Sequence, residues 1–509
     1  MKNTKEKLLY VLYVCGIWFL LLTFFLKIRP PVVNNGDDWA YIFFSRPAVP
    51  VWNGWNPCRV LPECLMPLCA HIAVLFVMPL CHDYIWSITI VSCAVICLII
   101  TLYIVLFGKF LRKVMNLSAG SAMLCTSLLL VFHFKSWMSP WIASLHLFHS
   151  IDLNNYFFYT IPVLLNGMLV LWFESKQEAI ERFYENENLT AKSFLVLMIY
   201  FAVFSNLFGN CVLAIYAGLR VLENLWACRK GNKGFLRFAK QNSVYLLVLV
   251  LWCVSAFFEL NGGRASGFFN PDQSFIARVK QTVWLLLDVI ERMDDAVFYS
   301  CIFATAAGIL LLIFSRRKCE EDRKYGRMLI RYGVAAVLTA VYLVPLCAII
   351  NKNYIERMEV ILGIMVYVFL VVFSSIAYVL KRCPKAELAL PLFICIMALP
   401  VIGNVHSFDL TNRGNTTEQA LAVSRDLLEQ VLKADEMGLK KVEVNVPKKS
   451  SKSNWPYPMN MGGNMLIALK QHGMIKNVTE IQIVPDSDYE SQILTRKEKI
   501  QNNSKEDLR

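Results

Sequence analysis

The chain of 509 residues is 56% hydrophobic and only 17% charged, with a mean hydropathy of +0.47. Soluble domains carry about 25% charged residues, so this composition excludes a soluble enzyme, and it equally excludes a disordered chain or a disulfide scaffold. The apolar residues cluster in runs of about 20, the length that crosses a bilayer core. The formal charge of +13 would favour nucleic acid binding in a soluble chain, but in a membrane protein it first reports topology.

The apolar runs predict an all-α polytopic membrane protein with about 11 transmembrane helices. The first run follows MKNTKEK and lacks a small-residue cleavage site, so we interpret it as a retained span and not as a signal peptide. The predicted spans cover residues 8–27, 84–107, 119–134, 155–173, 193–210, 211–228, 242–259, 296–315, 329–350, 358–380 and 387–405.

The basic residues favour a cytoplasmic N-terminus and an outward C-terminus. With this orientation the inward segments hold about 25 Lys and Arg residues, whereas the outward loops hold 11. Nearly all of the excess positive charge is therefore a cytoplasmic topology signal, and no basic patch remains that would indicate nucleic acid.

Three further apolar segments are predicted to lie at the outer membrane surface. Residues 61–80 are long enough to span, but a span here would reverse the charge pattern downstream, and the segment contains Pro62 and Pro67. It therefore lies along the surface or packs among the spans. Residues 275–290 place their apolar side chains on one helical face, and the aromatic-rich segment 137–149 is the third such element.

The polar tail differs in composition from the rest, which divides the chain into a membrane domain (1–405) and a small extracytoplasmic α/β appendage (406–509). The tail pattern predicts an amphipathic helix ending near Gly438 and a second helix in NMLIALKQHGM. KKVEVNVP and EIQIVP alternate as strands do. We expect the polar end after about residue 487 to be loose.

The long first outer loop, residues 28–83, carries the adjacent acids Asp37 and Asp38 about ten residues after the first span. Acids at a membrane surface are costly unless they bind a cation, pair with a base or act in chemistry. Neighbouring carboxylates push one pKa upward, which suits a general base. The alternative is that they are solvated or cap a helix.

This loop resembles the first outer loop of membrane glycosyltransferases of the GT-C type, in particular bacterial enzymes that modify surface polysaccharides from polyprenyl-linked sugars. The resemblance implies that Asp37 or Asp38 activates the acceptor hydroxyl, and that Trp39 and Arg59 contact substrate. The related bacterial pattern has its Gly and Arg close together, whereas WNPC separates Gly54 from Arg59 here. The residues that carry the resemblance are Asp37, Asp38, Trp39, Trp52, Asn53, Gly54, Trp55 and Arg59.

Glycosyl transfer from a lipid phosphate also needs cations that stabilise the departing phosphate, and Arg does this best through bidentate contacts. The outer cations nearest the bilayer are Arg59, Arg264, Lys352 and Arg357. Arg264 follows two glycines, which allow close backbone approach to a ligand. The alternative for each of them is a headgroup anchor or a snorkelling side chain.

The second outer loop holds His149, Asp152 and Asn154, groups that suit sugar hydroxyls. His149 and Asp152 are three residues apart and can share a helical face. Two ligands do not make a metal site, so no metal ligand set is assigned and a divalent cation remains an open option. An interfacial aromatic belt is the competing interpretation.

Most of the sixteen cysteines lie inside spans as small apolar residues, and only the first outer loop, with Cys58, Cys64, Cys69 and Cys81, could form a disulfide. No nucleotide-binding glycine pattern is present. An outward-facing site without a nucleotide needs an activated donor that arrives through the membrane, and a lipid-linked sugar is such a donor.

The leading hypothesis is therefore an inverting GT-C-type glycosyltransferase in the bacterial cytoplasmic membrane. It would move a sugar from a polyprenyl-phosphate-linked donor to a cell-surface glycan on the outer face. The alternatives are a flippase or transporter of lipid-linked glycans, which would carry more charge in mid-span, and a polysaccharide polymerase that uses the same lipid-linked chemistry.

Overall fold

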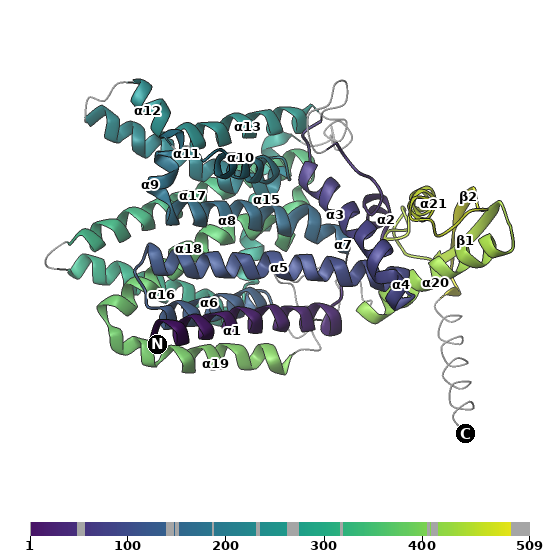
Figure 1. Cartoon of the computed structure of the whole chain (residues 1–509), viewed down its shortest axis with the longest axis horizontal. Coiled ribbons are helices and arrows are strands. Elements are labelled where there is room, and N and C mark those ends of the chain that lie inside the picture. Colours follow the sequence, from purple (N-terminus) through teal and green to yellow (C-terminus); the bar gives the residue numbers. More distant parts are fainter. Residues whose placement is uncertain are drawn as a thin grey trace.

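The protein is a helical bundle with a small α/β domain packed on one end (Figure 1). The computed structural model describes residues 2–47, 56–138, 147, 152–185, 188–230, 235–261, 274–315, 319–404, 408 and 416–489. Within these ranges ten helical stretches are long and apolar enough to cross a membrane, and one of the ten is Val60–Cys81, which was not predicted to span. Two predicted spans correspond to shorter apolar helices, Ala119–Lys135 and Leu189–Val203. This architecture agrees with a polytopic membrane protein.

The bundle uses long helices joined by short helical turns. Its elements are α1 (Lys2–Thr23), η1 (Phe24–Ile28), α2 (Gly36–Tyr41), α3 (Val60–Ile72), η2 (Ala73–Val77), α4 (Met78–Cys81), α5 (Tyr84–Lys113), α6 (Ala119–Lys135), α7 (Leu153–Asn155), η3 (Tyr156–Thr160), α8 (Ile161–Ser175), α9 (Gln177–Glu181), η4 (Phe183–Glu185), α10 (Leu189–Val203), α11 (Leu207–Lys230), α12 (Phe235–Gln241), α13 (Ser243–Leu260), α15 (Phe275–Glu291), α16 (Asp295–Phe314), α17 (Glu320–Ile350), η5 (Lys352–Glu356), α18 (Met358–Arg382), η6 (Pro384–Leu388) and α19 (Leu390–Gly403).

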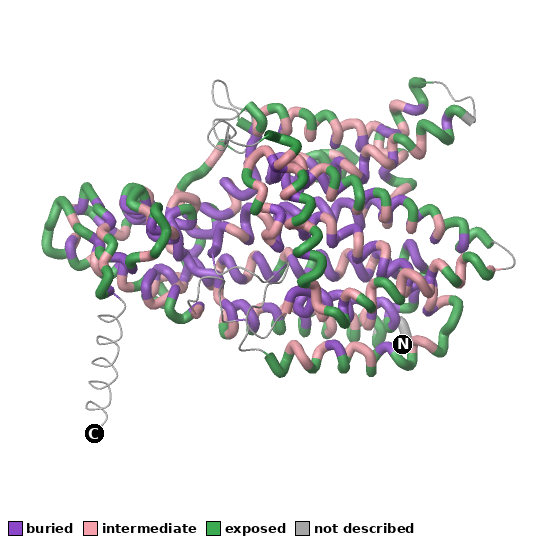
Figure 2. Tube along the Cα trace, turned by 180° about the vertical axis from the view of Figure 1, so that it is seen from behind, coloured by how far each residue is buried: buried purple, intermediate pink, exposed green. Residues whose placement is uncertain are grey.

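Helices α8 and α18 form the centre of the bundle, and the other helices surround them. The apolar stretch that contains α8 is 89% buried and that of α18 is 78% buried, whereas the corresponding values are 17% for α16 and 11% for the stretch that contains α19. The tube in Figure 2 shows the same gradient from a buried interior to exposed outer helices. Because the outer helices expose apolar side chains, the surface of the bundle suits lipid and not water.

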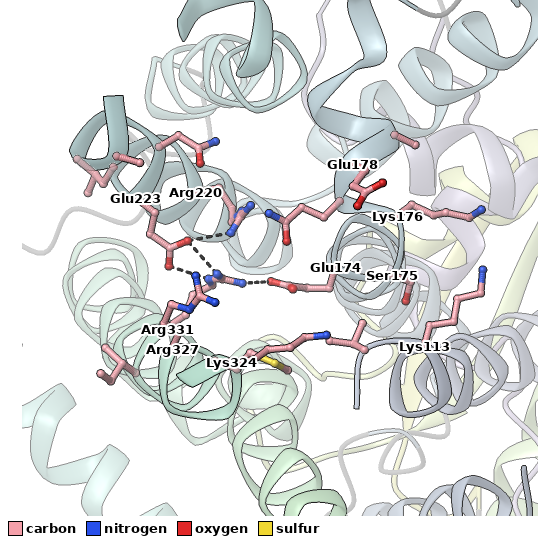
Figure 3. A pocket seen from close by; sticks show the side chains of 18 of the residues that line it. Lys113, Glu174, Ser175, Lys176, Glu178, Arg220, Glu223, Lys324, Arg327 and Arg331 are labelled. Atoms are coloured by element: carbon pink, nitrogen blue, oxygen red, sulfur yellow. Dashed lines mark hydrogen bonds and ion pairs between the residues drawn. The ribbon is translucent and has the colours of Figure 1, made fainter. Parts of the chain in front are cut away.

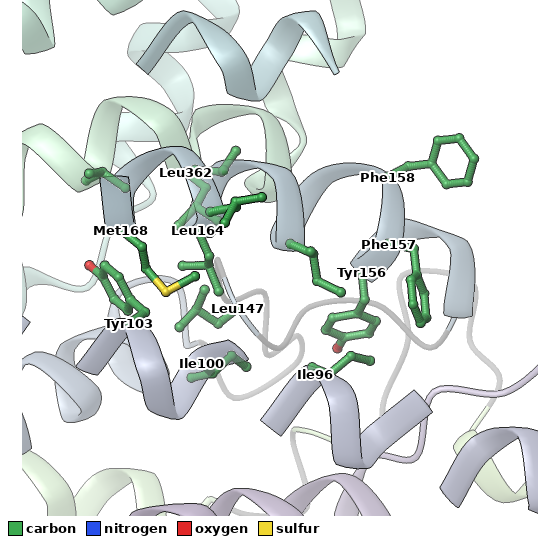
Figure 4. Close-up of a cluster of buried hydrophobic side chains, with 14 of the residues drawn as sticks. Ile96, Ile100, Tyr103, Leu147, Tyr156, Phe157, Phe158, Leu164, Met168 and Leu362 are labelled. Carbon is green, nitrogen blue, oxygen red and sulfur yellow. The ribbon is translucent and has the colours of Figure 1, made fainter. Parts of the chain in front are cut away.

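The core between α5 and α8 is apolar and close-packed (Figure 4). Ile96 and Ile100 of α5 are buried with Leu164 and Met168 of α8, and Leu362 of α18 joins this cluster. This packing holds α8 in place, and α8 continues from the segment that carries Asp152.

The small domain packs on the end of the bundle where α1 ends and α5 begins, here called the docked end; the opposite end is called the far end. Oδ2 of Asp83 forms an ion pair with Nη2 of Arg425 at 2.6 Å, and the Tyr84 hydroxyl lies 2.7 Å from Nδ1 of His472. By the predicted orientation, the docked end is the outer one.

The segment α3–α4 lies across the docked end and does not run through the bundle (Figure 1). The ring of His71, in the middle of this segment, is 4.8 Å from the ring of His472 in the small domain. Asp83, just after the segment, contacts the same domain. A stretch whose middle and end both meet one domain stays at one end of the bundle, as the charge pattern predicts.

Helix α15 also contacts groups at the docked end. Trp137, just after α6, donates its Nε1–H to the carbonyl of Val289 at 2.8 Å, and Lys352 binds Gln281 at 2.7 Å. Its other face is exposed and apolar, with Ile276 80% exposed, which fits a helix that lies on a membrane surface. The third predicted surface element, 137–149, lies largely outside the described residues.

The boundary predicted between the fifth and sixth spans, at residues 210 and 211, is wrong. The turn lies at residues 204–206, between α10 and α11. Asn206 causes this early start because its side chain accepts from the amide of Phe208 at 2.9 Å and donates to the carbonyl of Phe158 at 2.8 Å. The residues on both sides are apolar, so hydropathy alone does not locate the turn.

The small domain contains the helices and strands expected from the tail sequence: α20 (Thr417–Glu436), β1 (Lys441–Pro447), α21 (Met461–Gln471) and β2 (Glu480–Asp486). The strands pair in parallel, with Val444 opposite Ile483, and α21 forms the crossover. Gly462 allows this helix to approach β2, because a Cβ there would lie 2.2 Å from the carbonyl oxygen of Ile481. Residues 490–509, predicted to be loose, lie outside the described residues.

Candidate active site at the docked end

Helix α2 positions the two predicted acids through a capping box formed by Asn35 and Asp38. The Asn35 side chain accepts from the amides of Asp37 and Asp38, both at 2.9 Å. In return, Oδ2 of Asp38 accepts from the amide of Asn35 at 3.2 Å and from that of Asn34 at 3.0 Å. This reciprocal pattern satisfies the first amides of the helix and fixes the direction of both acidic side chains.

Asp38 is fully buried and joins two outer loops. Its Oδ1 accepts from the backbone amide of Asn154 at 2.7 Å, in addition to the two amides in its own loop. Burial raises the pKa of Asp38 well above its ordinary value, and the nearby Asp152 raises it further. A carboxyl group enclosed in this way holds the loop together and is not accessible to a substrate.

Asp37, in contrast, is exposed. The pKa of Asp37 is raised above its ordinary value, mainly because the surrounding protein partly desolvates the carboxyl group and then by the charge of Asp152. Arg59 and Arg357 act on it in the opposite direction. Asp37 is therefore the accessible acid of the pair, and it lies within the electrostatic reach of two guanidinium groups.

Arg59 is held at the start of α3 in the left-handed region, with a φ of 57°. Its Nε lies 3.4 Å from Oε1 of Glu259, and its guanidinium lies 6.0 Å from the centre of the Phe158 ring. These contacts join the first outer loop to the end of α13 and to η3.

Arg357 reaches the same region from the start of α18. Its Nε binds Oε1 of Glu359 at 2.5 Å, and its Nη2 donates to Oδ1 of Asn155 at 3.1 Å. The guanidinium also lies 4.9 Å from the ring centre of Tyr159 and 5.2 Å from that of Tyr354. Negative charge on Glu359 favours the charged form and holds the pKa of Arg357 above its ordinary value, against the effect of burial.

The second outer loop contributes backbone and carboxylate groups to this site. Asp152 accepts from the Nδ2 of Asn34 at 3.2 Å and forms an isolated bridge with Val32. Asn154 is buried and contributes its backbone amide to Asp38. The structure therefore brings Asp152 and Asn154 together with the acids of the first loop.

Other predicted residues lie elsewhere. Trp39 is fully buried, and its ring stacks on Tyr84 with 6.3 Å between centroids, so it presents no free face to a ligand. Lys352 binds Gln281 of α15. His149, Arg264 and the segment 52–55 lie outside the described residues.

Some residues of the site were not identified from the sequence. Glu259 and Glu359 partner the two arginines, and Asn35 caps the helix of the acids. The Asn-x-x-Asp spacing of the capping box was a usable local signal for Asn35. Nothing local to Glu259 indicates its partner, which lies 200 residues away in the chain.

The small domain contacts α2 directly. The amide of Gly36 donates to the carbonyl of Pro456 at 3.2 Å, and Nδ2 of Asn464 donates to the carbonyl of Gly36 at 3.1 Å. A Cβ at Gly36 would lie 2.8 Å from Cγ of Pro458, so only glycine fits here without displacement. The position of Asp37 thus depends on the docked domain.

We next considered metal sites and disulfides in the described part of the chain. There, no group of three or more His, Cys, Asp or Glu side chains is arranged to hold a metal ion. All sixteen cysteines are described and all are free, including the four of the first outer loop. No family model, curated protein or solved structure matches this chain.

Proposed function

We propose that this protein is an integral-membrane glycosyltransferase of the GT-C type. It transfers a sugar from a polyprenyl-phosphate-linked donor to a cell-surface glycan at the outer face of the bacterial cytoplasmic membrane. The observation that carries the proposal is Asp37, an exposed carboxylate with a raised pKa, within the electrostatic reach of Arg59 and Arg357 at one end of an apolar helix bundle.

In this mechanism Asp37 is the general base. It takes the proton of the acceptor hydroxyl as the acceptor oxygen forms a bond to the anomeric carbon. The bond from that carbon to the phosphate oxygen breaks, and the phosphate leaves with the electron pair. One displacement inverts the anomeric centre. Because Asp37 works only when deprotonated, its raised pKa moves the acidic limb of the rate profile above the ordinary carboxyl range.

The two arginines stabilise the charge that grows on the leaving phosphate. Arg357 uses Nε for Glu359 and Nη2 for Asn155, which leaves Nη1 for a phosphate oxygen. Its carboxylate partner fixes the guanidinium before substrate arrives, and such preorganisation costs no rearrangement during the reaction. Arg59 has the same kind of partner in Glu259.

The predicted topology supports this location. The basic segments, which mark the cytoplasmic side, connect helices at the far end, so the docked end with Asp37 faces outward. A site at this depth is accessible both to a lipid-linked donor in the bilayer and to a polymer outside the cell. Asp38, fixed by three backbone amides, is the residue that positions Asp37.

The test is sugar transfer by the purified full-length protein, supplied with a polyprenyl-phosphate-linked hexose and cell-wall glycan. We expect Asp37→Asn to lower the rate about 10²- to 10⁴-fold without changing the melting temperature. Asp288→Asn is the matched control, because Asp288 is an exposed acid on α15 that pairs only with a surface arginine among its described contacts. Full activity of Asp37→Asn overturns the mechanism, and donor translocation without transfer assigns the chain to the transporters.

A further inference from the structure

A large pocket lies at the far end of the bundle, away from Asp37. It has a volume of about 1290 Å³ and is enclosed by the ends of α5, α8, α11 and α17 with α9 (Figure 3). Ten of its lining residues are charged, six basic and four acidic. Nothing in the proposed transfer reaction uses this pocket.

Two arginines neutralise the inner acids of the pocket. Arg331 pairs with Glu174 and binds both carboxylate oxygens of Glu223 at 2.8 Å. Arg220 binds Glu223 and Glu181, each at 2.9 Å. Figure 3 shows the contacts of Glu223 with Arg220 and Arg331, and of Arg331 with Glu174, as one connected network. The network sets two arginines against three glutamates, so both guanidinium groups already have carboxylate partners.

Three lysines of the lining are outside that network. Lys113 of α5 and Lys176 at the end of α8 extend toward the same part of the pocket, and their like charges repel each other (Figure 3). Lys324 of α17 lies on the adjoining wall. None of the three forms an ion pair within the described residues. Arg327 and the acids Glu178 and Glu320 of the lining are also outside the network, so the lining keeps four basic side chains against two acidic ones.

The rim of the same pocket is apolar. Leu222 and Trp226 of α11 and Ile330 of α17 line it and are 61%, 65% and 68% exposed. Such side chains on the surface of a transmembrane bundle face lipid. The pocket lining therefore combines exposed lysines with exposed apolar side chains, which matches a ligand with a phosphate at one end and hydrocarbon at the other.

We propose that this pocket is a binding site for a phosphate-bearing anion, held by Lys113, Lys176 and Lys324. The apolar rim favours the headgroup of an anionic lipid over a soluble phosphate, and basic pockets between transmembrane helices are suited to such headgroups. By the predicted orientation this lipid belongs to the cytoplasmic leaflet. The site is independent of the transferase chemistry at the docked end.

The test uses the full-length protein in nanodiscs of phosphatidylcholine, with and without phosphatidylglycerol, and measures retained lipid by native mass spectrometry. We expect Lys113→Gln/Lys176→Gln to weaken phosphatidylglycerol binding about 10- to 30-fold, since each lysine near a lipid headgroup contributes about 1 kcal/mol. Lys5→Gln/Lys7→Gln is the matched control, because it removes two exposed cations from α1 at the same end of the bundle. Equal binding by the two double variants overturns the proposal.

A second arm separates the two sources of phosphate. Inorganic phosphate is added to the phosphatidylcholine nanodiscs and the melting temperature is measured. A phosphate-dependent rise that the lysine variant lacks assigns the site to a soluble phosphate, and a rise only with phosphatidylglycerol assigns it to a headgroup. If neither anion binds the wild-type protein, the proposal is wrong. Lys324→Gln repeats the test from α17, so poor folding of the double variant does not prevent an answer.

Discussion

Buried acids at the two ends of the bundle are stabilised by different groups. At the far end, Glu174 is buried and Glu223 is half-exposed, and each contacts a guanidinium directly. At the docked end, Asp38 is buried without an ion pair among the described residues and accepts three backbone amides instead. Guanidinium groups hold the acids of the far end, whereas burial and the nearby Asp152 raise the pKa of Asp38 against the effect of its backbone amides. Both buried acids are therefore structural, but only the one at the docked end fixes a loop that carries an exposed acid, Asp37.

The largest effect on stability is expected at the far end. Arg331→Met leaves Glu174 buried without its guanidinium, and breaking such a pair costs about 3–5 kcal/mol. The free energy of unfolding is measured by SDS titration of the purified protein. The control is Arg327→Met, one turn earlier on α17, where the side chain is exposed and the expected change is within about 0.5 kcal/mol. Equal unfolding of the two variants contradicts a structural role for the network.

At the docked end, substitution of Arg357 should lower the rate of sugar transfer. Arg357→Gln removes a cation from the leaving phosphate, and the expected loss of transfer is about 10²- to 10³-fold. Arg357→Lys keeps a charge beside Glu359 and should recover part of the rate, which separates catalysis from folding. Arg292→Gln, an exposed cation at the same end, is the control. If Arg357→Gln and Arg292→Gln transfer sugar equally fast, Arg357 does not contact the phosphate.

Substitution of the two adjacent acids should change the stability of the protein by different amounts. Asp38→Ala leaves three buried amides without an acceptor, and we expect a loss of about 1–3 kcal/mol. Asp37→Ala should change stability by less than about 0.5 kcal/mol because Asp37 is exposed. Thermal unfolding of the two variants side by side is the measurement. A larger loss for Asp37 would reverse the roles assigned to the pair.

The smallest expected effect is a pH dependence of domain docking. Burial, together with the charge of His71, lowers the pKa of His472 to about 4. Because the folded pKa is below the unfolded one, the stabilisation is present above about pH 6.5 and is lost as the pH falls toward about 4. Between about pH 7 and about pH 5.5 the loss is about 1 kcal/mol. Hydrogen exchange of α21 and α3 should report it, and His472→Gln should abolish the pH dependence; an unchanged profile in that variant contradicts this assignment.

Much of the fold could be predicted from local pattern. Apolar runs located the spanning helices, and the elements of the tail followed from their periodicity. The structure places α3–α4 at the docked end, which agrees with the charge pattern, because a span there would have reversed every later loop. The error at residues 204–206 arose because apolar residues flank the turn and its cause is a contact of Asn206 with a distant helix.

The candidate site was predictable only in part. The acids of the first loop were identified from their position after the first span, and Arg357 from its depth in the membrane. The different environments of Asp37 and Asp38 were not predicted from the sequence. They depend on Asn154, which lies 116 residues away from Asp38 in the chain. Trp39 was assigned to substrate by resemblance, and the structure buries its ring against Tyr84.

Hydropathy and charge depend on residue type and sequence order, so the sequence by itself determined the membrane class, the approximate spans, the expected orientation and the α/β pattern of the tail. Burial and pairing depend on which distant segments meet, so only the tertiary structure decided which acid is accessible, which arginines have partners and which lysines do not. The positive charge illustrates this division. Its sum and distribution predict topology, but only the tertiary structure shows that Arg220 and Arg331 are paired with acids while Lys113 and Lys176 form no ion pair within the described residues.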